Sequence, residues 1–211
     1  MSDRGWHTSE VSYSSVGPVQ LTSPIVAWLD ESGSNSALDP NTYMLAAAIC
    51  RAENVETARA AMSEASLKGQ RKIHWRDDND KRHRAVIEVV AGLQVEHLVV
   101  VRSRPTNSAD SPERRRRKCL ERILFELTSM DVGHAIMESR GPADDRRDRA
   151  MLDHLRRTRA LPATIRLDHA PGPSDPMLWI ADAVCGAVSE SRWDNAFCYE
   201  QLAGKIELVE I

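Results

Sequence analysis

The sequence predicts an α/β fold in which a mixed β-sheet, an antiparallel hairpin plus parallel strands, is flanked by helices. Two apolar segments typical of strands come first, at residues 25–30 and 43–50, separated by a loop that contains Asn, Asp and Pro. After them, segments with helical spacing alternate with single short apolar segments. A hairpin followed by alternating helices and strands is the element order of a mixed sheet with helices on its faces.

The elements can be justified in chain order. Residues 53–67 are rich in Ala and contain no helix breaker before Gly69, which predicts a helix. A short extended piece at 71–75 follows, and apolar residues at helical spacing then predict a helix at 80–93. The β-branched segment 95–102 is typical of a strand.

The second half continues the alternation. The predicted elements are a helix at 112–130 with one apolar face, a strand at 133–139, a highly charged helix at 142–159, a strand at 163–168, an apolar helix at 175–190, and a last strand or strand pair within 197–211. The acidic residues at 77–80 are expected to cap the helix that begins there.

Length and composition predict one globular domain at 23–211 behind a flexible leader at 1–22. The chain has 211 residues, of which 42% are hydrophobic, enough for a core of useful size. The leader is polar and lacks the apolar centre of a signal peptide, and its alternative is an edge strand around 19–21.

Four cysteines far apart in the chain favour reduced thiols, and no apolar stretch is long enough to span a membrane. We therefore expect a soluble, cytoplasmic protein.

Charge is unevenly distributed along the chain. The net charge is −3, yet residues 102–122 contain eight Lys and Arg against three acids. Such a segment could bind the phosphates of a nucleic acid, and the alternative is a solvated helix face.

The segment 25–33 is the most informative one, because an apolar strand ends there in two adjacent carboxylates followed by Ser-Gly. Side chains alternate along a strand, so Asp30 and Glu31 must point to opposite faces of the sheet. We expect Asp30 to point into a site at the sheet edge, with Glu31 supporting it or facing the loop.

Asp182 is an isolated acid inside the apolar run 177–188. A buried carboxylate costs several kcal/mol unless it is paired, so its position indicates a functional site. Gly186, one helical turn further on, would allow a close approach by another backbone or a ligand. The alternatives are that Asp182 pairs with an Arg or lies on a solvent-facing stripe.

Further candidates share the property that they lie at the ends of predicted elements. Glu138 and Asp168 end predicted strands, and His74 lies in the short extended piece. Converging carboxylates bind Mg²⁺ or Mn²⁺, and two such ions can promote phosphodiester cleavage. The alternatives are a surface acid beside Arg140 for Glu138, a turn residue for Asp168, and a hydrogen-bonded histidine at a helix entry for His74.

Three segments resemble the domain-of-unknown-function family 3800. They are Trp28-Leu-Asp-Glu-Ser-Gly33 with the apolar run that follows, Ile73-His-Trp75, and the Ala-Asp helix 179–187. The resemblance spans about residues 24–190 and implies a ribonuclease H-like fold, with Asp30, Glu138 and Asp182 as metal ligands. The Pro-Gly-Pro segment at 171–173 departs from that family's usual pattern.

The leading functional hypothesis is therefore a Mg²⁺- or Mn²⁺-dependent nuclease, or a related phosphoryl-transfer enzyme, acting on DNA or RNA. Asp30, Glu138 and Asp182 would hold the ions, and Glu31, His74 and Asp168 would orient water or ligands. The family resemblance implies a role in mobile elements or phage defence. One alternative is a non-catalytic binding module or partner subunit that retains the fold, and another is a structural homodimer.

Overall fold

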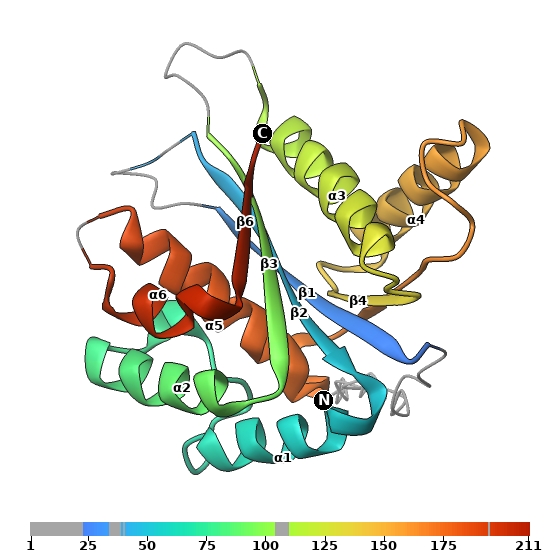
Figure 1. Cartoon of the computed structure of the whole chain (residues 1–211). Helices are drawn as coiled ribbons and strands as arrows, with labels where there is room; N and C mark the ends of the chain where they lie inside the picture. The colour runs from blue at the N-terminus through green and yellow to red at the C-terminus, as the bar shows by residue number, and fades with distance from the viewer. Residues whose placement is uncertain (1–22, 34–38, 40, 104–109, 194) are drawn as a thin grey trace, which may run out of the picture.

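The computed structural model describes residues 23–33, 39, 41–103, 110–193 and 195–211 (Figure 1). The predicted leader at 1–22 lies outside the described residues. Six strands form one sheet in the order β5-β4-β1-β2-β3-β6. The strands are β1 (Ile25–Gly33), β2 (Tyr43–Arg51), β3 (Val95–Arg102), β4 (His134–Glu138), β5 (Arg166–Ala170) and β6 (Ile206–Glu210).

The strand directions confirm the predicted mixed sheet. β1, β2 and β3 form an antiparallel series, whereas β4 pairs with β1, β5 with β4 and β6 with β3 in parallel. The hairpin of β1 and β2 lies at the centre of the sheet, with β4 and β5 on the side of β1 and β3 and β6 on the side of β2. The carboxyl ends of β1, β3, β4, β5 and β6 therefore lie along the same edge of the sheet.

Helices cover both faces of the sheet (Figure 1). One face carries α1 (Val55–Ala65), α2 (Asp80–Gly92), α5 (Pro176–Ser191) and α6 (Phe197–Leu202), and the other carries α3 (Pro112–Ser129) and α4 (Pro142–Arg157). Because both faces are covered, the central strands are apolar almost throughout instead of alternating with polar residues.

Side-chain alternation divides the apolar core into two parts. Val26 and Trp28 of β1 pack with α1, α2 and α5, whereas Ala27 and Leu29 pack with α3 and α4. The alternation carries Asp30 to the α5 face and Glu31 to the α3 face.

Three predicted elements can be compared in detail with the structure. The extended piece predicted at 71–75 ends at His74, which is extended, and a 3₁₀ helix begins at Trp75. Of the last strand or strand pair predicted within 197–211, a single strand forms, β6, and α6 precedes it. The strand predicted at 163–168 forms at 166–170, so Asp168 lies in its middle and does not end it. Pairing with the already placed β4 decides this register, and the local apolar pattern does not contain that information.

Other expectations agree with the structure. Asn79 caps α2 by accepting a hydrogen bond from the Arg82 amide, within the acidic segment predicted to do so. All four cysteines are buried free thiols. Among the described residues, none of the helices has the length and apolarity needed to cross a membrane.

Candidate functional site

Two carboxylates lie side by side where the pairing of β1 with β4 ends, while β1 itself continues to Gly33. Leu29 of β1 pairs with Met137 of β4, so the next residues, Asp30 and Glu138, follow each other across the two strands. Both face α5, and the Asp30 side chain is only 9% exposed. The Glu31 backbone N–H donates to Asp30 Oδ1 at 2.8 Å, which orients this carboxylate.

The third carboxylate, Asp182, is brought to the same place by α5. The helix packs on β1, where the Cys185 thiol donates to the Asp30 carbonyl oxygen at 3.6 Å. The Trp75 backbone N–H donates to Asp182 Oδ2 at 2.9 Å, and His74 Nδ1 lies 3.5 Å from the same oxygen. The structure thus brings together Asp30, Glu138, Asp182 and His74, four residues that the sequence singled out.

Gly186 allows the close approach that its position predicted, and the group that approaches is the Trp75 ring. A Cβ atom at position 186 would overlap the ring atoms of Trp75. The other side of the ring stacks on His83, with ring centroids 3.8 Å apart. This packing fixes the segment that carries both His74 and the amide bound to Asp182.

Lys72 is the member of the site that the sequence reasoning missed. Its Nζ lies 2.5 Å from Glu138 Oε2 and 3.9 Å from Asp30 Oδ2, with the side chain 14% exposed. A signal was present: in an extended segment with Ile73 buried, the side chains at 72 and 74 point to the same side. Because His74 was a candidate site residue, Lys72 on the same side of the segment should have been a candidate too.

The electrostatics show that these groups form one cluster. Burial raises the pKa of Asp30 well above its usual value, and the neighbouring charges of Asp182 and Glu138 raise it further, while Lys72 lowers it. Burial also raises the pKa of Asp182. Ionising all three carboxylates together is therefore costly unless positive charge is supplied.

The carboxylate oxygens of the cluster are the right kind of ligand for a hard cation, but their present positions do not surround a common ion. Within the described ranges, no three His, Cys, Asp or Glu side chains are already placed to hold a metal ion. The reason is visible in the contacts, because the Lys72 ammonium lies between Glu138 and Asp30. The pKa values of Asp30 and Asp182 are raised. Together with Glu138, these carboxylates remain the donor set that Mg²⁺ and Mn²⁺ prefer.

Asp30→Asn should raise the free energy of unfolding in metal-free buffer, by about 0.5–2 kcal/mol. A carboxyl whose pKa is raised in the folded state disfavours folding above that pKa, and the penalty is relieved as pH falls toward it. Urea denaturation in EDTA at pH 7.5 measures the change. Asp131→Asn, the same substitution at an exposed position before β4, should have little effect. A lower stability of Asp30→Asn would contradict the electrostatic account.

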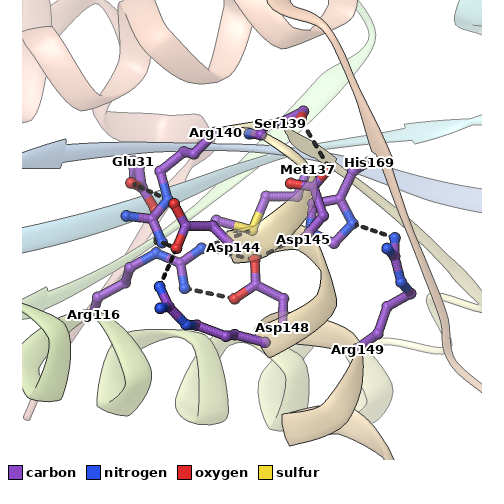
Figure 2. Close-up of polar contacts among 12 residues, drawn as sticks. Glu31, Arg116, Met137, Ser139, Arg140, Asp144, Asp145, Asp148, Arg149 and His169 are labelled. Atoms are coloured by element: carbon purple, nitrogen blue, oxygen red, sulfur yellow. Dashed lines mark hydrogen bonds and ion pairs between the residues drawn. The ribbon is translucent and has the colours of Figure 1, made fainter.

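Glu31 lies on the opposite face of the sheet, as alternation predicted, and its carboxylate is outside the cluster around Asp30. Its two oxygens contact Arg116 Nε at 2.8 Å and Arg140 Nε at 3.1 Å (Figure 2). Glu31 therefore links β1 to α3 through Arg116, and its role in orienting water or ligands stays a prediction.

Arg116 is the centre of a buried ion-pair network beneath this face (Figure 2). Its guanidinium donates to both oxygens of Asp148 in α4, at 2.5 and 2.8 Å. His169 of β5 contacts the same carboxylate at 3.0 Å. Burial alone would raise the pKa of Asp148, but the hydrogen bonds from Arg116 and His169 lower it to about 2. The basic run at 102–122 is thus not wholly solvated, because Arg116 is buried.

Asp168, predicted to support the site, lies away from the carboxylate cluster. It contacts His134 Nε2 at 3.0 Å and Arg166 at 2.7 Å. Both partners belong to the amino-terminal halves of β4 and β5, whereas Glu138 ends β4. The later start of β5 is the reason for this separation.

A cavity of about 620 Å³ opens beside the cluster. His74, Arg76 and Asp182 line one part of it, and Trp193 lines another. The cavity gives one of the three carboxylates, Asp182, direct contact with open space.

Solved ribonuclease H structures are similar to this chain in fold. Bst-RNase HIII in complex with Mn²⁺ gives a TM-score of 0.57 at 16% sequence identity, covering 88% of this chain and 58% of that one. Ribonuclease H2 from Pyrococcus horikoshii OT3 gives 0.53 at 14% identity, covering 86% and 76%. This chain thus spans less than two thirds of the length of Bst-RNase HIII.

No protein-family model and no curated protein sequence matches the chain, so its membership of family 3800 has no support beyond the motifs. The fold, in contrast, is supported, since the element order, the strand directions and the similar structures agree. The chain has a ribonuclease H-like fold, with a mixed six-stranded sheet between two layers of helices.

Proposed function

We propose that this protein is a divalent-metal-dependent nuclease that cleaves phosphodiester bonds in a nucleic acid. One observation carries the proposal: carboxylates from β1, β4 and α5 meet on one face of the sheet, and the Lys72 ammonium contacts those from β1 and β4. Three acids collected in a largely buried place oppose folding, so their presence is explained best by a ligand of opposite charge.

Mg²⁺ or Mn²⁺ is the ligand that this donor set fits, held by Asp30, Glu138 and Asp182. A divalent ion in such a site activates water and stabilises the charge that develops on a phosphoryl oxygen. The Mn²⁺ present in the similar Bst-RNase HIII structure supports the choice of ion.

The remaining residues of the site would position the reactants. His74 is 44% exposed, lies beside Asp182 and lines the cavity, so its ring can hold or accept a proton there. Arg76 lines the same cavity and supplies a positive charge for a backbone phosphate. The Trp75 amide keeps Asp182 in place during these steps.

The decisive test is cleavage of labelled DNA, RNA and RNA/DNA hybrid by the purified protein in Mn²⁺ and in Mg²⁺. We expect cleavage of at least one of these substrates, and its fall to background in Asp30→Asn and in Asp182→Asn, because each substitution removes a ligand oxygen and its charge. Asp131→Asn is the matched control and should cleave as well as the unmodified protein. Equal cleavage by all four proteins would sink the proposal.

A second candidate is a non-catalytic binding or partner subunit that retains the fold. It is favoured by the existing ion pairs, since Lys72 already neutralises part of the carboxylate charge. Calorimetric titration with Mn²⁺ separates the two candidates. Binding that Asp30→Asn abolishes supports the nuclease, and an absence of heat together with no cleavage supports the binding subunit.

A further inference from the structure

Lys72 is held so that its ammonium must lie in the carboxylate cluster. The segment that carries it is fixed on its carboxyl side, because Ile73 is buried in the core and the Trp75 amide binds Asp182. Its Nζ reaches Glu138 at 2.5 Å and Asp30 at 3.9 Å. The charged end of the side chain thus lies where a cation bound by these two carboxylates would also lie.

We infer that Lys72 permanently supplies one of the positive charges of this site, so that the cluster binds a single divalent ion in place of a pair. The inference rests on the proposed function and deepens it. Two-ion sites place their ions about 3.5–4 Å apart between shared carboxylates, and the Lys72 ammonium takes one such place.

The balance of charge supports a single ion. Asp30, Glu138 and Asp182 carry three negative charges when ionised, and Lys72 with one divalent ion carries three positive charges. The side chains are largely buried, at 9%, 21% and 13% exposure for the three acids. A second divalent ion beside Lys72 would leave two positive charges uncompensated in a poorly solvated place, which is strongly unfavourable.

The contacts of Glu138 and Asp182 also support a single ion, because only one of these two acids is held by Lys72. Glu138 is engaged by Lys72 at 2.5 Å, and Gly172 packs against its carboxylate so closely that a Cβ atom there would overlap it. Asp182 has no contact with Lys72 at that distance and lines the open cavity. The cluster is therefore divided into an end that the ammonium holds and an end that faces the cavity.

Calorimetric titration with Mn²⁺, in the absence of nucleic acid, tests the inference through stoichiometry. The unmodified protein should bind one ion, and so should Lys72→Arg, which keeps the charge. Lys72→Met, which keeps the length of the side chain without the charge, should bind two. Lys72→Gln provides a second neutral variant in case Lys72→Met does not fold.

The outcomes separate this inference from the proposed function. Two ions bound by the unmodified protein, or only one bound by the folded neutral variants, would overturn the role of Lys72 and leave the nuclease proposal standing. No Mn²⁺ binding by any variant would overturn both. The unmodified protein and Lys72→Arg can still overturn the inference, by binding two ions, even if neither neutral variant folds.

Discussion

Replacing Arg116 by Met should lower the free energy of unfolding by about 3–5 kcal/mol, the usual cost of removing one partner from a buried ion pair. Arg116 is 3% exposed and bridges Glu31 of β1 and Asp148 of α4. Without it, Asp148 keeps His169 and Glu31 keeps Arg140, so a buried carboxylate and a half-buried one are left with weaker compensation. Urea denaturation at pH 7 measures the loss.

The matched control is Arg147→Met in α4. Arg147 is 67% exposed and pairs with Asp144 three residues away, a geometry that contributes less than about 1 kcal/mol. If both variants lost the same small amount, the network around Arg116 would not be a stabilising element. The losses should not add, because removing Asp148 as well takes away a carboxylate that Arg116→Met leaves weakly compensated. A variant lacking both residues should therefore lose less than the sum of the two single losses.

Acidification should remove roughly 4–5 kcal/mol of stability through His97 alone. Burial lowers the pKa of His97 from 6.5 to about 3, with a smaller contribution from the charge of Lys205. The imidazole of His97 therefore binds a proton near pH 6.5 in the unfolded chain but only near pH 3 in the folded chain. Its contribution to the free energy of unfolding is fully present above pH 6.5 and is lost progressively as pH falls toward 3.

His97→Leu tests this directly. His97 is 1% exposed and, within the described residues, neither ring nitrogen has a hydrogen-bond partner, so Leu should be tolerated at pH 7. The free energy of unfolding of the variant, followed by urea denaturation from pH 7 to pH 4, should fall less steeply by up to about 1.4 kcal/mol per pH unit. His154→Leu, at an exposed position in α4, should keep the slope of the unmodified protein. An unchanged slope in His97→Leu would contradict the assignment.

Sequence reasoning reached the carboxylates of the site because their local context was unusual. Asp30 ends an apolar strand and Asp182 interrupts an apolar helix, and each placement is unfavourable enough to indicate a function. Glu31 could be assigned to the other face from alternation alone. The role of these residues as metal ligands stays a proposal, although the structure brings Asp30, Glu138 and Asp182 into one electrostatic cluster.

Sequence reasoning was less successful where a residue depends on distant partners. Arg116 belongs to a basic run that is typical of a solvated helix face, yet carboxylates from β1 and α4 enclose it. Asp168 was expected near the site, but the register between β4 and β5 places it beside His134. Lys72 donates to Glu138, which lies 66 residues further along the chain, and no local pattern names that partner.

The amino-acid sequence by itself determined most of the element types, the α/β class and the face on which Asp30 lies, because these follow from local periodicity and from the alternation of side chains along a strand. The tertiary structure alone decided which charges meet. Register between strands and the docking of α5 on β1 bring together groups far apart in the chain, and the free energy of a buried charge depends on neighbours that no local pattern specifies.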